Sequence, residues 1–362
     1  MILVVNAGSS SIKIELFEPD LTSLLSGSVS EIGGDARLTL GGDKRPVEAP
    51  DHVAAINELI AGLEAQGYRL SDLAAAGHRI VHGGAEMTQP VRLTSDVLRR
   101  IEAFTPLAPL HNPHNLVAIY ALTHRLPDLP QFGSFDTAFH ASNPRVATEY
   151  ALPKELRALG LRRYGFHGLS YASMVEHFGE ALPRRLLGLH LGNGASLCAM
   201  LDGRSVATSM GYSPLEGLTM GTRSGSIDGM LVLRLAGERG IDETDRLLNL
   251  QSGLKGLAGT NDMAAILARD DDEARFAVEH FCYWAARHAG SAIVAMGGLD
   301  AVAFTGGIGE NAAAVRDRIM EHLAFLGEVP VHVVPADEER QIARDTLRLL
   351  AQDTDTGRKT LD

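Results

Sequence analysis

The chain opens with the stretch ILVVNAGSSSIKIEL (2–16), which decides the fold. Its residues 2–5 are apolar and mostly β-branched, so they predict a buried strand. Residues 6–11 are small and mostly polar, which is typical of a turn. Residues 12–16 then alternate between apolar and charged side chains, as a second strand does. The chain therefore begins as two strands joined by a loop of small residues.

A similar opening returns about half a chain later. Residues 186–191 are apolar, residues 192–196 read GNGAS, and another apolar segment follows. A duplicated architecture would produce this self-similarity, although one repeated hairpin is weak evidence for it. With 362 residues the chain is also too long for a typical single core, so we expect two domains.

Strand and helix patterns alternate through the rest of the chain. Strands are predicted at 76–81 and 301–305, and helices at 51–66 and 274–296. A last helix is predicted from Asp337 to about Leu350, followed by a frayed polar tail after Gln352.

Composition excludes several classes of function. The chain has 33 Lys and Arg against 45 Asp and Glu, a net charge of −12, which argues against a nucleic-acid-binding surface. Neither a signal peptide nor a stretch long enough to span a membrane is recognisable, so no membrane association is expected. Cys198 and Cys282 lie in apolar stretches and are interpreted as reduced, buried thiols. The expected location is the cytoplasm.

Three loops rich in glycine follow predicted strands, at 6–11, 190–196 and 304–311. Small residues let backbone N–H groups approach an anion, although tight turns also need glycine. None of the loops matches the P-loop pattern or a clean GxGxxG dinucleotide fingerprint. Together they favour a phosphate-rich ligand held in some other fold.

Two arginines and one aspartate stand next to such turns. Arg79 lies in HRIVHGG (78–84) and Arg223 in GTRSGS (221–226), where a guanidinium can present a planar fork to a carboxylate or phosphate. Asp136 follows a predicted strand, where it could orient an arginine, hold the water shell of a metal, take part in proton transfer or simply cap a helix.

Seven histidines lie in segments rich in Gly, Pro or Asn. The pair in HNPHN (111–115) could suggest a metal site, but zinc needs three or four ligands and the proline breaks a helical presentation. Donation to phosphoryl oxygens is the better functional interpretation. Satisfaction of loop carbonyls remains open for His78, His82, His114 and His140. The other three histidines are His111, His167 and His190.

Eight segments, in the same order along nearly the whole chain, closely resemble the acetate kinases. They are VVNAGSSSIK (4–13), HRIVHGG (78–84), PLHNPHN (109–115), FDTAFH (135–140), YGFHGLS (164–170), HLGNGAS (190–196), SMGYSPLEGLTMGTRSGSID (209–228) and FTGGIGEN (304–311). The resemblance implies an α/β fold of two duplicated RNase H-like domains, as in actin and sugar kinases. Each domain would have a mixed five-stranded sheet flanked by helices, and the active site would lie in the cleft between them.

The resemblance also implies domain limits and an activity. Residues 1–137 plus 337–362 would form the N-terminal acetate-kinase domain with a returning C-terminal helix. Residues 138–336 would form the nucleotide-binding and dimerisation domain of a homodimer. The activity would be reversible, Mg²⁺-dependent, in-line phosphoryl transfer from ATP to acetate, giving acetyl phosphate and ADP, with Mn²⁺ as a substitute metal.

Site residues follow from the same resemblance, position by position. Those implied in catalysis are Asp136, His167 and Arg223. Those implied in binding the carboxylate and its methyl group are Arg79, Val81, Leu110, Phe166 and Pro214. Those implied in binding Mg²⁺ are Asn6 and Glu338. Those implied in binding the nucleotide and its phosphates are Ser9, Ser11, Lys13, His111, His190, Leu191, Gly192, Asn193, Gly194, Asp262, Gly307, Ile308, Gly309, Glu310 and Asn311.

The sequence departs from the family pattern near the adenine, because Ala264 stands where an Arg is expected two residues after Asp262. Three alternatives remain. A propionate kinase differs by one methylene in the substrate, which is worth about 1–3 kcal/mol. A non-catalytic, ATP-sensing module of the actin-like fold would not need the acceptor-site residues. A metallohydrolase built on the histidines lacks a helical HExxH arrangement.

Overall fold

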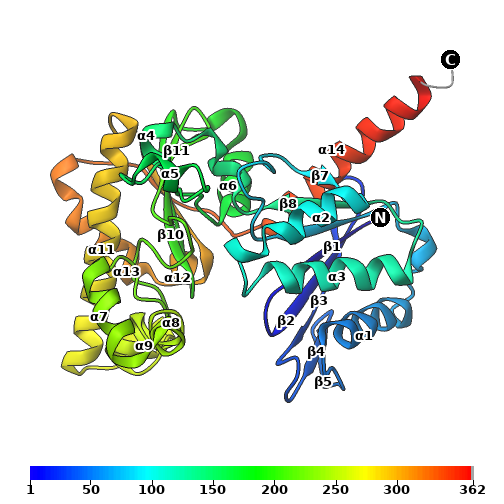
Figure 1. The fold of residues 1–362 in the computed structure, drawn as a ribbon, viewed down its shortest axis with the longest axis horizontal. Helices are drawn as coiled ribbons and strands as arrows, with labels where there is room; N and C mark the ends of the chain where they lie inside the picture. The colour runs from blue at the N-terminus through cyan, green and yellow to red at the C-terminus, as the bar shows by residue number, and fades with distance from the viewer. Residues whose placement is uncertain (360–362) are drawn as a thin grey trace. The chain divides into compact units, whose positions relative to one another are not determined.

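The computed structural model describes residues 1–359 and divides into two compact units. The first comprises Met1–Ala138 together with the C-terminal segment that begins at Asp337, and the second comprises Phe139–Ala336. Figure 1 labels their elements. Within residues 1–359, none of the helices combines the length and the apolar character that crossing a membrane requires.

The first unit is built on an eight-stranded mixed sheet. Its strand β1 pairs antiparallel with β2 and parallel with β6, which in turn pairs parallel with β8. From edge to edge the strands are β5 (Asp43–Pro46), β4 (Arg37–Leu40), β3 (Ser23–Ser30), β2 (Ser11–Phe17), β1 (Ile2–Ala7), β6 (Ala75–Ile80), β8 (Gln131–Phe135) and β7 (Val91–Arg92).

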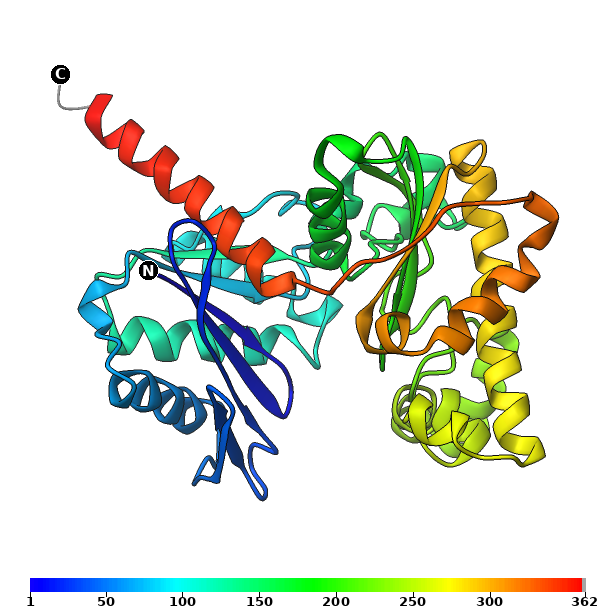
Figure 2. The same ribbon diagram turned by 180° about the vertical axis from the view of Figure 1, so that it is seen from behind.

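Helices cover both faces of this sheet (Figures 1 and 2). Leu3 and Val5 of β1 share a buried cluster with α1 (His52–Ala65) and α3 (Asn112–Arg125). Alternate residues point the other way, and a Cβ on Gly77 of β6 would lie 2.3 Å from the hydroxyl of Thr346. The face opposite α1 and α3 is therefore covered by the C-terminal helix α14. The unit's other helices are η1 (Leu70–Asp72), α2 (Ser95–Ala103) and η2 (Thr105–Leu107).

Helix α14 spans Glu338–Lys359. The predicted end of the helix near Leu350 and the predicted frayed tail after Gln352 were therefore wrong, because the helix continues to Lys359. The polar residues that follow Leu350 suggest a frayed end from the sequence alone. However, they contain no proline, and no glycine before Gly357, so nothing in them stops a helix that the sheet already anchors.

The second unit has a five-stranded mixed sheet. Read across the sheet from one edge to the other, the four pairs of neighbouring strands are antiparallel, antiparallel, parallel and parallel. The strands β3-β2-β1-β6-β8 of the first unit pair in the same succession. The duplicated α/β fold is thus confirmed. The strands in order are β11 (Arg204–Thr208), β10 (Ala195–Leu201), β9 (Arg185–Leu191), β12 (Ala301–Thr305) and β13 (Val331–Val333).

Five strands were expected in each sheet, and the first sheet exceeds that number by the short edge strands β4, β5 and β7. The β4–β5 hairpin turns at Gly41 and Gly42, whose φ angles are 56° and 96°. Glycine enters this left-handed region without the steric penalty of a side chain. The hairpin extends the edge of the sheet without altering the core pattern.

Helix α6 (Gly168–Phe178) packs on one face of the second sheet, where Tyr171 and Met174 meet Leu186 and Met200. Helix α11 (Asp272–Met296) runs along the other side of the strands (Figure 1). The remaining helices of this unit are α4 (Arg145–Thr148), α5 (Lys154–Arg157), η4 (Gly179–Ala181), α7 (Gly229–Arg239), α8 (Ile241–Leu250), α9 (Gly253–Ala258), α10 (Met263–Leu267), α12 (Gly306–Asn311), α13 (Ala313–His322) and η5 (Ala324–Leu326), and η3 (Ala138–Ser142) begins at the boundary.

Candidate active site

Four of the predicted residues of the first unit meet at one edge of its sheet. Asn6 lies at the end of β1, Arg79 lies in β6 and Asp136 directly follows β8. These strands are parallel, so their carboxyl ends lie at the same edge. Asn6 and Arg79 also alternate onto the α14 face, where Glu338 and Glu339 begin the helix.

Arg79 is the centre of this group. Its Nη2 lies 2.6 Å from Asp136 Oδ2 and its Nε lies 3.0 Å from Asp136 Oδ1, a two-pronged ion pair. Its Nη1 donates to Asn6 Oδ1 at 3.3 Å, and its Nε lies 3.9 Å from Glu338 Oε2. Asn6 Nδ2 in turn donates to Glu339 Oε1 at 3.1 Å. The guanidinium is thus held in one orientation by both strand ends and the helix.

The group carries more acid than base. The side chain of Asp136 is only 2% exposed and that of Glu338 14%, while Lys13 contributes a second cation at longer range. Burial by itself would lower the pKa of Arg79, but Asp136 and Glu338 raise it above its ordinary value. Burial raises the pKa of Glu338, and Asp136 and Glu339 raise it further, against the opposing effect of Arg79.

An excess of carboxylate and amide oxygens of this kind suits Mg²⁺, a cation that prefers oxygen ligands. Within the part of the chain that the structure describes, no three His, Cys, Asp or Glu side chains form a ready-made metal cage. Mg²⁺ commonly takes one or two protein ligands and completes its shell with water and substrate phosphates.

Two predicted histidines of the second unit, His167 and His190, meet on the α6 face of its sheet. His190 is the second-last residue of β9 and lies opposite Ser196 of β10 in the strand register. His167 directly precedes α6 with φ = 58°, a left-handed conformation that is uncommon for residues other than glycine. The rings of His167 and His190 stack with centroids 4.2 Å apart. Such an outlier next to paired histidines is typical of a functional position.

Arg223 lies beside these rings and has a different environment from Arg79. Among the residues that the structure describes, no carboxylate pairs with Arg223, whose Nη1 donates to Pro214 O at 3.4 Å. Burial without a charged partner lowers its pKa. A Cβ on Gly194 would lie 3.2 Å from His167 Nε2 and 3.7 Å from Arg223 Nη1. A half-buried cation thus faces the glycine loop together with a histidine, which is the chemistry of an anion site.

Four loops meet around Asn193. Its carbonyl accepts from Gly221 N at 2.9 Å, and its Oδ1 accepts from Asn261 Nδ2 at 3.0 Å. A Cβ on Gly192 would lie 4.0 Å from Gly307 N. The segments predicted to bind the nucleotide are therefore adjacent in this unit, although they are far apart in the sequence.

Several residues assigned to the nucleotide also hold their own loops in place. Glu310 Oε1 accepts from Gly306 N and from Ala336 N, both at 3.0 Å. Asn311 Nδ2 donates to Gly307 O at 2.9 Å, and Asp262 caps α10 by accepting from Ala264 N at 2.9 Å. A structural role therefore accompanies any contact of these side chains with a ligand. The intervening Ile308 and Gly309 belong to α12, and Leu191 ends β9.

The remaining predicted residues occupy varied positions in the two units. Ser9 and Lys13 are exposed, Ser11 begins β2, and His111 precedes α3. The apolar residues predicted for the acetate methyl divide between the units. Val81 is buried and Leu110 is 53% exposed in the first unit, whereas Phe166 is buried in the second, which also contains Pro214.

Sequence reasoning missed residues that hold these groups together. HNPHN was interpreted through its histidines, but Asn112 and Asn115 are the buried side chains that bond the ends of the strands. Asn115 accepts from Val81 N at 3.0 Å and donates to Ala7 O at 2.7 Å, and Asn112 accepts from His82 N at 3.1 Å. Glu339 was missed as a partner of Asn6. Its signal was only its place beside Glu338.

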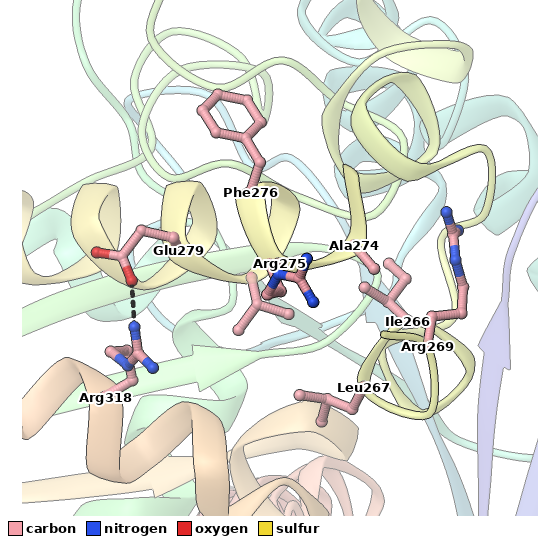
Figure 3. Close-up of a pocket in the computed structure, with 9 residues that line it drawn as sticks. Ile266, Leu267, Arg269, Ala274, Arg275, Phe276, Glu279 and Arg318 are labelled. Atoms are coloured by element: carbon pink, nitrogen blue, oxygen red, sulfur yellow. Dashed lines mark hydrogen bonds and ion pairs between the residues drawn. The ribbon is translucent and has the colours of Figure 1, made fainter. Parts of the chain in front are cut away.

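A separate pocket of about 480 Å³ lies in the second unit between α10, α11 and α13 (Figure 3). Ile266, Leu267 and Phe276 supply its apolar surface. Its three arginines all pair with acids, as Arg318 does with Glu279. No residue predicted for the site lines it, so this pocket is not part of the candidate active site.

Comparison with known proteins gives one consistent result. The chain matches the acetokinase family over residues 1–347. It is 41% identical to an acetate kinase from Nitrobacter hamburgensis over 388 positions, covering 96% of each chain. A solved propionate kinase from Francisella tularensis has a TM-score of 0.92 at 36% identity, covering 96% of this chain and 99% of that one. An acetate kinase from Porphyromonas gingivalis has a TM-score of 0.89 at 34% identity with the same coverage. The chain therefore belongs to the acetokinase family, the family of the acetate kinases.

Proposed function

We propose that this enzyme transfers the γ-phosphoryl group of ATP reversibly to acetate, giving acetyl phosphate and ADP with the help of Mg²⁺. The observation that carries the proposal is Arg223, a half-buried cation with no acid partner among the described residues, beside His167 and the loop at Gly194. Membership of the acetokinase family supports acetate as the acceptor and ATP as the nucleotide.

The second unit would bind and stabilise the phosphoryl group. Phosphoryl transfer asks little covalent chemistry of the protein, so catalysis is mostly positioning and stabilisation of charge. Arg223 and His167 would donate to the equatorial oxygens of the group in flight, where such donors act most strongly away from water. The loops around Asn193 and Gly307 would hold the rest of the nucleotide.

The first unit would bind the acceptor and the metal. Arg79, fixed by Asp136, would orient the carboxylate, while Asn6 and Glu338 would hold Mg²⁺. When bound, Mg²⁺ neutralises charge on the phosphates. A carboxylate oxygen forms the new bond to phosphorus as the bond from phosphorus to the ADP oxygen breaks. The carboxylate already carries the electron pair that attacks, so no enzyme nucleophile is required.

A homodimer formed through the second unit completes the proposal. Helix α7 has no buried residue, and its apolar Met230 and Leu233 are 72% and 64% exposed. Such a face favours a protein partner. Light scattering should give twice the chain mass, and Leu233→Asp should reduce it to one chain. A monomeric wild type would reject this part of the proposal.

Propionate is the second candidate acceptor, favoured by the similarity to the propionate kinase. One methylene changes binding by about 1–3 kcal/mol, so both acids are expected to react at different rates. Ala264 leaves the base of the nucleotide without the arginine that the family pattern places there. GTP is therefore a useful comparison with ATP.

The test traps the acyl phosphate with hydroxylamine after incubation with ATP, Mg²⁺ and either acid. Hydroxamate from acetate or propionate is expected, and the ratio of the rates identifies the preferred acid. Arg223→Ala and His167→Ala should reduce the rate by orders of magnitude, about 10²–10³-fold for the loss of one such donor. Arg184→Ala removes an exposed surface pair, 3.6 Å from Asp202, and serves as the control. No hydroxamate with either acid would reject the proposal.

A further inference from the structure

His167 is anchored through two hydroxyl groups. Its Nδ1 lies 2.9 Å from Ser196 Oγ, and Ser196 Oγ lies 2.6 Å from the hydroxyl of Tyr171. Ser196 and Tyr171 are both 0% exposed. Tyr171 is one turn after His167 on α6, and Ser196 is on the facing strand β10, so the three groups form one chain between a helix and the sheet.

The protons of this chain can be counted. Each hydroxyl carries one proton, and a phenol, with a pKa near 10, is a better donor than an aliphatic hydroxyl. The hydroxyl of Tyr171 therefore donates to Ser196 Oγ. The hydroxyl proton of Ser196 is then directed to His167 Nδ1, which accepts it. In the neutral ring, the proton of His167 must then reside on Nε2.

The Nε2 side of the ring faces the glycine loop and Arg223. A Cβ on Gly194 would lie 3.2 Å from His167 Nε2 and 3.7 Å from Arg223 Nη1, so the two nitrogens lie close to the same point. Nε2 can donate a hydrogen bond at this point only if it bears a proton. The neighbouring ring has a similar anchor, because His190 Nδ1 lies 2.8 Å from Ser170 Oγ.

We propose that Ser196 and Tyr171 are positioning residues that fix His167 as the Nε2–H tautomer, so that a hydrogen-bond donor is always directed at the phosphoryl oxygens. The identity of the acceptor rests on the proposed function. The tautomer itself is inferred from the geometry of the three side chains and does not depend on the identity of the acceptor. Neither hydroxyl touches the substrate in this proposal, and both act through the imidazole.

The first test is spectroscopic and does not depend on activity. In protein labelled with ¹⁵N-histidine, proton–nitrogen correlation spectra distinguish a protonated ring nitrogen from an unprotonated one. The signals of His167 are identified by their loss in His167→Gln. We expect an unprotonated Nδ1 and a protonated Nε2 in the wild type, and a mixture of tautomers in Ser196→Ala. Ser196→Thr, which keeps the hydroxyl, should restore the wild-type pattern. A protonated Nδ1 in the wild type would overturn the proposal.

A matched control separates positioning from a general loss of packing. Thr219 Oγ1 lies 3.1 Å from His280 Nδ1, so Thr219→Val removes a comparable buried bond between a hydroxyl and a histidine. Both variants should lower the thermal midpoint, but Thr219→Val should alter the signals of His280 and leave those of His167 in place. Equal changes at His167 in the two variants would refute a specific role for Ser196.

Kinetics then links the tautomer to turnover. Ser196→Ala is expected to lower kcat about 10-fold with little change in KM for acetate, and Ser196→Thr should recover most of it. Tyr171→Phe should have a smaller effect in the same direction. The two proposals can fail separately. An Nε2–H tautomer in a protein that forms no hydroxamate would reject the proposed function alone. Full activity in Ser196→Ala with a scrambled tautomer would reject the positioning role alone.

Discussion

The arginine clusters of the two units have opposite charge balances. Arg79 is surrounded by Asp136, Glu338 and Glu339, so its charge is more than compensated. Arg223 is half-buried with no carboxylate partner among the described residues, and its removal from water lowers its pKa. The two duplicated units therefore place arginines near their glycine loops in contrasting electrostatic surroundings.

The difference indicates what each unit lacks before its ligand arrives. An acidic group with one central cation is stabilised by a further cation, whereas an unpaired buried cation is stabilised by an anion. Under the proposed function these would be Mg²⁺ and the phosphoryl group. The comparison makes separate predictions for the two arginines, because folding stability should depend on Arg79 but not on Arg223.

The largest expected effect on stability is that of Arg79→Met. Removing the guanidinium leaves Asp136, which is 2% exposed, as a buried charge without its partner. Breaking such a pair costs about 3–5 kcal/mol. Hydrogen exchange in peptides from β1, β6 and β8 would measure the loss in the first unit. Arg100→Met removes an exposed pair with Glu86 and should cost at most about 1 kcal/mol. Equal losses in the two variants would contradict the compensated state of Arg79.

Arg223→Met should show the opposite behaviour. Loss of a donor at the transition state costs about 3–4 kcal/mol, or 10²–10³-fold in kcat. The unfolding free energy of the second unit should stay the same or rise, since an unpaired buried charge is replaced by an apolar side chain of similar length. Steady-state kinetics and hydrogen exchange of β9 and β10 would check the two halves. A destabilised second unit would show that Arg223 has a partner in solution.

Glu338 offers a smaller, pH-dependent test in the first unit. Its pKa is raised from an ordinary 4.5 to about 7, mainly by burial. Between these values the folded chain keeps a proton that the unfolded chain has lost, so stability falls as pH rises from 4.5 to about 7 and then levels off. Without Mg²⁺, the wild type should lose roughly 1–3 kcal/mol between pH 5 and 8 relative to Glu338→Gln. Parallel urea midpoints for the two proteins would contradict the raised pKa.

The repeated hairpin made the fold predictable because its information is local. Residues 2–16 and their counterpart near 186–201 each combine an apolar run, a small-residue turn and a second strand, and the structure confirms the α/β duplication. The number of strands in the first sheet, in contrast, does not follow from local sequence. β4, β5 and β7 are short edge strands, and their pairing depends on a sheet that is already present.

The sequence predicted the site where the ends of neighbouring strands bring residues together. It did not predict contacts that depend on how individual side chains pack in the folded chain. The parallel β1, β6 and β8 explain why Asn6, Arg79 and Asp136 meet. The contact of Asn6 with Glu339, 333 residues away, depends on the rotation of α14, which the sequence does not reveal. Ser196 and Tyr171 were missed for the same reason. Nothing in the sequence distinguishes their hydroxyl groups, and their proposed role depends on the contact with His167 in the folded chain.

The smallest predicted effect is protection of the second unit by inorganic phosphate. If Arg223 and His167 form an anion site, phosphate at five times its Kd should add about 1 kcal/mol to the stability of that unit. Chloride at the same ionic strength controls for screening. Hydrogen exchange of β9 and β10 should show protection in the wild type and in Arg79→Met, but not in Arg223→Met. Protection of the first unit instead, or the same protection by chloride, would reverse the comparison, because the anion would then not be drawn to the uncompensated arginine.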